Sequence, residues 1–231
     1  GSEKCPIDWS SWYGSNPDSY YAGHCGKGTK DAGLGDPMLS VSSLLLVIAL
    51  VYVKWEGPLF TPLASVFVGI ASFLFHAANT ETSSTLDFIG LNLLSPAILA
   101  DLFRWRGHNV LAFATFTVFL TAAILVRVLV ENSFPIRQDI FNNYIYINQP
   151  ILAALIFLLA YCWDYIRQLW VGAVFIVGGS ATLIVANNVD VFWECVNTQL
   201  IEPHFWGHLF VAIGTTLFSR AIVHNGGYSK L

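Results

Sequence analysis

Charged residues are scarce in this chain. Of 231 residues, 11 are Lys or Arg and 15 are Asp or Glu, so the charged fraction is 11%, whereas soluble proteins carry about 25%. Hydrophobic residues make up 55% of the chain. This imbalance predicts an integral membrane protein. The formal net charge of -4 and the lack of a basic run argue against nucleic acid as a partner.

Stretches that lack Lys, Arg, Asp and Glu locate the membrane segments, because a spanning helix needs roughly 20 apolar residues. Six such stretches are 37–53, 57–80, 107–126, 140–163, 168–189 and 203–219. A seventh apolar segment runs from Thr85 to Phe103 and contains only Asp87 and Asp101 as charges. Strands of a barrel are shorter, at about ten alternating residues. The sequence therefore predicts an all-α membrane protein, a seven-transmembrane helix bundle.

Basic residues in the short connections lie on one side of the predicted bundle. They are Lys54, Arg104, Arg106, Arg167, Arg220 and Lys230. The opposite short loops, 78–84 and 190–202, hold no Lys or Arg. The positive-inside rule therefore places the N-terminus outside or in a lumen and the C-terminus in the cytoplasm. We expect an exosolic cap over 1–36, a seven-helix domain over 37–223 and a cytoplasmic tail over 224–231.

Three histidines, His76, His204 and His208, fall in segments of membrane length, while His108 stands at the inner end of its segment. Ionisable groups are expensive in a bilayer, so each is a functional-site hypothesis. The spacing of four puts His204 and His208 on one helical face, and a third imidazole would complete a zinc site with an open fourth position. The predicted topology places all three, together with Asp87, at similar depth in the outer half of the bilayer. Ser72 lies one turn from His76 on the same face.

Each polar residue also has a structural interpretation. Asp87 can be an N-terminal helix residue favoured by the helix dipole, and Ser72 can bond its own helix or pack at an interface. Two histidines can ligate haem, but that would leave Asp87 and the third histidine unexplained. The last span has no lysine for a retinal Schiff base. Gly178 and Gly179 indicate close helix packing or a kink.

The combined pattern is Ser72-x-x-x-His76, then Asp87 eleven residues on, then His204-Phe-Trp-Gly-His208. It resembles the alkaline ceramidase family, within the wider group of seven-helix hydrolases that includes the progestin and adipoQ receptors. All five positions match in order and spacing. The resemblance implies zinc held by the three histidines, a water nucleophile, Asp87 as its base and Ser72 as a helper at the developing oxyanion.

The same resemblance implies the substrate and the location of the site. The family hydrolyses the amide of ceramide to sphingosine and a fatty acid. A two-tailed lipid would enter from the bilayer between helices, and the active site would face the outer or lumenal side. Two alternatives stay open. One is a receptor-like or binding member of the same group with little turnover, and the other is a hydrolase of another membrane lipid.

The N-terminal region departs from the family, which carries calcium ligands there. No acid stands beside Cys25, although Asp31 and Asp36 leave a Ca²⁺ site open. The resemblance implies a disulfide between Cys25 and Cys195. The residues themselves allow any pair among those two and Cys5, because all three are predicted on the outer side, where disulfides form.

Overall fold

The structure is a computed structural model that describes residues 37–53, 57–78, 81–131, 151–164, 166–188 and 203–224. Within these ranges the chain is helical apart from short turns and contains no strand. The elements are α1 (Pro37–Ser43), the 3₁₀ helix η3 (Leu44–Tyr52), α2 (Phe60–Ala78), α3 (Glu81–Trp105), α4 (Asn109–Glu131), α6 (Ile166–Asn188) and α8 (Pro203–His224). A further helix covers Ile151–Cys162.

Each of the seven predicted segments contains a helix, so the all-helical prediction is confirmed. Four helices are long and apolar enough to cross a membrane: Phe60–Ala77, Thr85–Trp105, Asn109–Arg127 and Phe205–Val223. The other three apolar helices are shorter within the described residues: Ser40–Tyr52, Ile151–Cys162 and Leu169–Thr182. The number of spans therefore stays a prediction.

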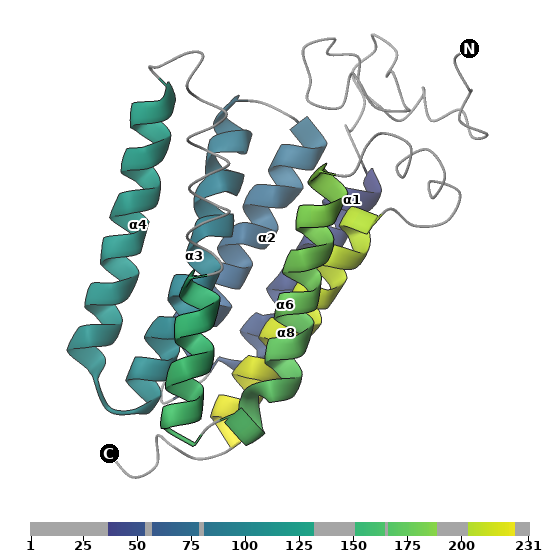
Figure 1. Cartoon of the computed structure of the whole chain (residues 1–231). Helices are drawn as coiled ribbons and strands as arrows, with labels where there is room; N and C mark the ends of the chain where they lie inside the picture. Colours follow the sequence, from purple (N-terminus) through teal and green to yellow (C-terminus); the bar gives the residue numbers. More distant parts are fainter. Residues whose placement is uncertain are drawn as a thin grey trace, which may run out of the picture.

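The helices pack in an order that brings distant segments together. α2 contacts α3, α1 and η3; α3 also contacts α4; and α8 contacts η3 and α6. Figure 1 shows α4 at one edge of the bundle and α6 beside α8 toward the other. α2 ends, and α3 and α8 begin, at the same end of the bundle (Figure 1). This arrangement brings His76, Asp87 and His208 to one end.

The first segment is not a single α-helix, because the winding changes to 3₁₀ after Ser43. Side chains three residues apart eclipse in a 3₁₀ helix, and accordingly Leu46 and Ala49 are the buried residues of η3. Gly69 lets α2 approach this segment, since a Cβ at that position would lie 2.8 Å from the Ser43 carbonyl oxygen. The junction of α1 and η3 is thereby packed directly on α2.

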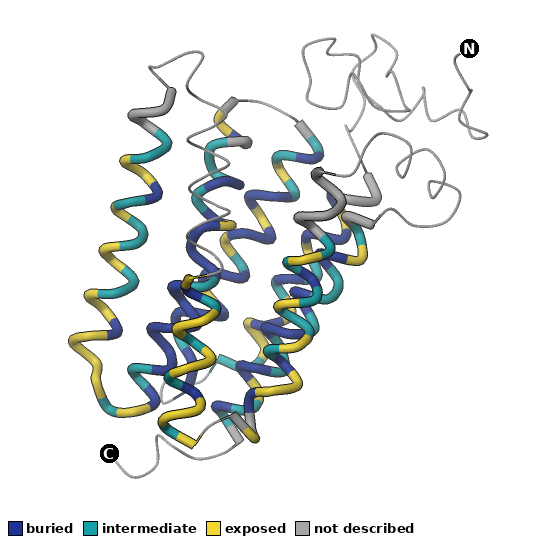
Figure 2. Tube along the Cα trace, viewed as in Figure 1, coloured by how far each residue is buried: buried dark blue, intermediate teal, exposed yellow. Residues whose placement is uncertain are grey.

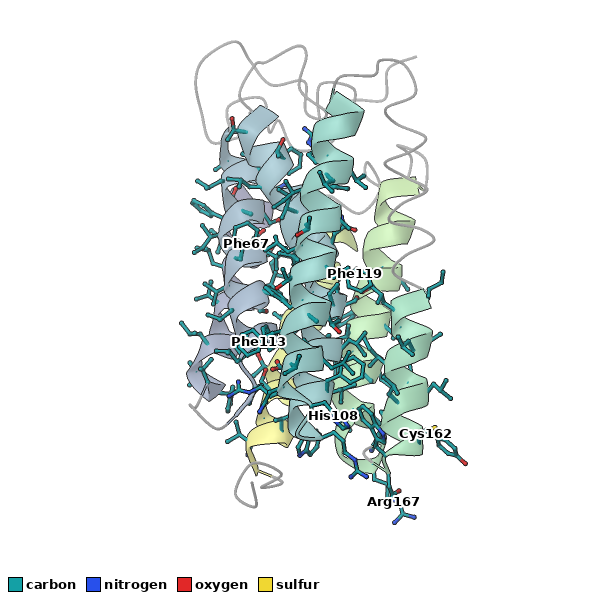
Figure 3. The ribbon with its side chains drawn as sticks, turned by 90° about the vertical axis from the view of Figure 1, so that its left-hand side faces the viewer. Phe67, His108, Phe113, Phe119, Cys162 and Arg167 are labelled. Atoms are coloured by element: carbon teal, nitrogen blue, oxygen red, sulfur yellow. The ribbon has the colours of Figure 1, made fainter. Side chains whose placement is uncertain are left out.

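The exposed face of α2 is apolar, whereas its buried face mixes apolar with polar side chains. The apolar side chains that it exposes are Leu63, Phe67, Ile70 and Leu74. Its buried polar side chains are Thr61, Ser65, Ser72 and His76. Figure 2 shows the buried positions where α2 faces its neighbours, and Figure 3 labels Phe67 on the outer surface. A soluble protein shows the opposite preference, so this distribution suits a lipid environment.

Asp101 of α3 caps the start of α2. Its Oδ1 accepts hydrogen bonds from the backbone N–H groups of Leu59 (2.9 Å) and Phe60 (3.2 Å), and its Oδ2 accepts one from Thr61 (2.7 Å). The first N–H groups of a helix lack partners within the helix, and a carboxylate also complements its dipole. Arg104 lies only three residues later on α3, but the carboxylate is directed to the backbone at the start of another helix.

We predict that Asp101→Ala lowers the free energy of unfolding by about 1–3 kcal/mol, because buried donors are left unsatisfied. Tryptophan fluorescence during thermal unfolding in detergent measures the change. Asp101→Asn is the matched control, since its amide keeps one oxygen acceptor and should lose less. An unchanged midpoint in Asp101→Ala would show that the cap contributes nothing to stability.

Candidate active site

His76 and His208 form a buried pair between α2 and α8. They are 2% and 4% exposed, and their ring centroids lie 5.6 Å apart with the rings tilted by 58°. Two imidazoles that share one tetrahedral zinc, at a Zn–N distance of about 2.0–2.1 Å, should have centroids roughly 5 Å apart. The observed separation is therefore suitable for one shared metal ion.

Asp87 is joined to the helix that carries His76 by a hydrogen bond to Ser72. The Ser72 side chain, one turn before His76 on α2, hydrogen-bonds the Asp87 carboxylate. Asp87 is only 9% exposed, and its Oδ1 is buried without a hydrogen-bond partner among the described residues. Leaving a buried carboxylate oxygen unpaired is costly. The cluster thus contains one buried carboxylate oxygen that no described residue binds.

The position of Asp87 weakens its purely structural interpretation. α3 begins at Glu81, so Asp87 stands in the second turn, whereas the dipole effect falls off within the first turn. Its side chain is turned to Ser72 on the neighbouring helix instead. We therefore treat Asp87 as a residue of the site.

Two serines of the first segment complete the surroundings of His208. Its Nδ1 lies 3.0 Å from the Ser42 Oγ and 3.3 Å from the Ser43 Oγ, and both serines are at most 1% exposed. Neither serine is among the predicted site residues. The signal that could have found them is a pair of adjacent hydroxyls in an otherwise apolar membrane-length segment, because such residues mark polar contacts between helices.

The third predicted ligand, His204, lies in the first turn of α8, one turn before His208. Its side chain lies outside the described residues. Among the side chains that the structure describes, no group of three or more His, Cys, Asp or Glu residues could hold a metal ion. The structure therefore brings two of the three predicted ligands together, and the three-histidine set remains a prediction.

The predictions for the N-terminal region and for the disulfide lie outside the described residues. They concern Cys5, Cys25, Asp31, Asp36 and Cys195. Cys162, at the end of the helix Ile151–Cys162, is a free and exposed thiol.

Glycines hold α8 against α6 at the level of the histidine motif. A Cβ at Gly179 of α6 would lie 2.7 Å from the Val211 amide nitrogen and 2.9 Å from the Gly207 carbonyl oxygen. A Cβ at Gly214 of α8 would likewise meet the α6 backbone at 2.7 Å. Gly178 faces open space. The prediction of close packing in this segment is confirmed at Gly179, and Gly207 within the His204–His208 motif is part of the contact.

Fold and site together define an all-helical protein with several helices of membrane-spanning length and a buried cluster of histidine, serine and aspartate. No protein-family model, no curated protein and no solved structure matches the chain.

Proposed function

We propose that this protein is an intramembrane zinc-dependent amidase that hydrolyses ceramide to sphingosine and a fatty acid. One observation carries the proposal: a buried histidine pair lies one helical turn from a serine that hydrogen-bonds a buried carboxylate. The resemblance of the five-residue pattern to alkaline ceramidases supplies the substrate class.

His76 and His208 would hold the metal together with His204, which the pattern adds as the third ligand. Neutral imidazoles suit zinc, whereas calcium and magnesium prefer oxygen ligands. The ion, when bound, would polarise the amide carbonyl and lower the pKa of water. The buried Asp87 Oδ1 without a partner supports this assignment, because it provides the acceptor that a water at such a site requires.

Asp87 is assigned as the general base. Its free Oδ1 accepts the proton of the attacking water and then delivers it to the leaving amine nitrogen, so that one carboxylate serves both steps. Ser72 orients the carboxylate in the free protein. With substrate bound, we assign its hydroxyl to the developing oxyanion.

The proposal includes seven spans, an outer or lumenal N-terminus and a cytoplasmic C-terminus. Arg106, Arg167 and Arg220 are exposed. They lie near the C-terminus of α3, the N-terminus of α6 and the C-terminus of α8. Figure 3 labels Arg167 at the end opposite to the start of α8. A basic end of this kind supports a cytoplasmic assignment. The site would then lie in the outer half of the bilayer, open to a lipid entering between helices.

Incubating the purified protein with ceramides and with lipid esters, with and without chelator, tests the proposed function. We expect release of sphingosine and fatty acid, loss of product with chelator and recovery on adding zinc. Preference for an ester would indicate a hydrolase of another lipid. Zinc binding without any turnover would favour a receptor-like protein.

A further inference from the structure

Two hydroxyl groups of α1 contact the Nδ1 atom of His208. Ser42 and Ser43 both place their Oγ atoms within 3.3 Å of its Nδ1, while the ring faces His76 across the site. We propose that these two serines are positioning residues, which accept the Nδ1–H of His208 and so present its Nε2 lone pair as the metal ligand. This inference rests on the proposed function, because it names the groups that prepare one of its ligands.

The chemistry of imidazole decides what the serines must do. A neutral ring has one nitrogen that donates and one that accepts. If the serine hydroxyls donated to Nδ1, Nε2 would carry the proton and could not bind a metal. Serine hydroxyls in membrane helices commonly donate to the carbonyl four residues before, and the oxygen then accepts. Two acceptors around Nδ1 stabilise the tautomer in which Nε2 is free.

The backbone around the serines is fixed by a second contact. The Ser43 carbonyl oxygen lies so close to α2 that a Cβ at Gly69 would approach it to 2.8 Å. Gly69 stands one turn before Ser72 and two turns before His76 on α2. The first segment therefore touches the helix that carries His76 and, through its hydroxyls, the ring of His208. Through these two contacts the first segment helps to fix the position of His208 relative to His76, although it contributes no metal ligand itself.

The expected effect is on the metal as well as on the ring. Groups that hold the second nitrogen of a ligating histidine typically contribute 10–100-fold to metal affinity. Each serine is within reach of Nδ1, so one can replace the other. Ser42→Ala or Ser43→Ala alone should weaken zinc binding only slightly, and the double variant should weaken it 10–100-fold.

The experiment uses the full chain in detergent with two readouts. NMR of histidine labelled with ¹³C and ¹⁵N, in metal-free protein, reports the tautomer of His208, whose signal is identified by its loss in His208→Ala. Chelator competition reports zinc affinity. Ser42→Thr with Ser43→Ala restores one hydroxyl and should rescue both. Ser65→Ala is the matched control, since Ser65 is a buried serine of α2 that bonds Thr215 of α8 at 3.4 Å.

We expect the Nδ1–H tautomer in the unaltered protein and in Ser65→Ala, and a shift toward Nε2–H with weaker zinc binding in the double alanine variant. An Nε2–H tautomer in the unaltered protein overturns the inference, and so does a double variant with unchanged tautomer and affinity. Absence of zinc binding in the unaltered protein would contradict the proposed function instead, while the metal-free NMR would still decide the role of the serines.

Discussion

Asp87→Asn will keep zinc and the folded state but lose hydrolysis by about 10²–10⁴-fold, the usual contribution of general acid–base catalysis. The amide keeps the shape of the side chain and can still accept a hydrogen bond from Ser72. It cannot take a proton from water at the position of the free Oδ1. Turnover of a ceramide substrate and zinc content, measured on the same preparation, check the prediction.

The variant Ser72→Ala serves as a control that distinguishes the role of Asp87 from that of its hydrogen-bond partner Ser72. Ser72→Ala should cost no more than the loss of one oxyanion donor, about 10²–10³-fold, with zinc retained. Near-normal turnover in zinc-loaded Asp87→Asn would contradict the mechanism and move the interpretation toward a receptor-like protein.

His208→Ala will lose zinc and turnover together. In the proposed three-histidine site, removing one of the two facing imidazoles leaves two protein ligands, so zinc affinity should fall sharply. The change also removes the contacts of the ring with Ser42 and His76, so the protein should unfold at a lower temperature. Elemental analysis of the purified variant measures the metal.

His108→Ala is the matched control for this variant. His108 is an exposed histidine in the turn between α3 and α4, near Trp163 at the opposite end of the bundle (Figure 3). We expect its zinc content and turnover to remain normal. Unchanged zinc in His208→Ala would mean that the ligand assignment is wrong.

The helices could be located from the sequence because charge is excluded from the membrane core. A gap between charged residues predicts α2, and the apolar segment around Asp87 and Asp101 predicts α3, each to within a few residues of its observed ends; all seven predicted segments contain a helix. His76, Asp87 and His208 were identified for the same reason, since an ionisable group in an apolar segment is conspicuous, whereas Ser72 was assigned from its place in the family pattern. The structure brings these four side chains to one end of the bundle.

Other features depend on contacts that no sequence spacing encodes. Asp101 has a charged neighbour in Arg104, yet its carboxylate binds the backbone at the start of α2, which lies some forty residues earlier in the chain. Ser42 and Ser43 carry no charge and no periodic pattern, and their role follows only from the position of His208. The change to a 3₁₀ helix after Ser43 is likewise invisible in a uniformly apolar segment.

The backbone contact between α6 and α8 has a consequence for how the protein can work. Gly179 and Gly214 put no Cβ between the two helices where their backbones come closest, so a movement of α8 at this contact would either carry α6 with it or open the contact. A receptor that signals by displacing its ligand-binding helix needs freedom at that contact. A hydrolase instead needs its catalytic side chains held in fixed positions relative to one another. The glycine contact therefore restricts the movement of α8, which carries His208, relative to α6.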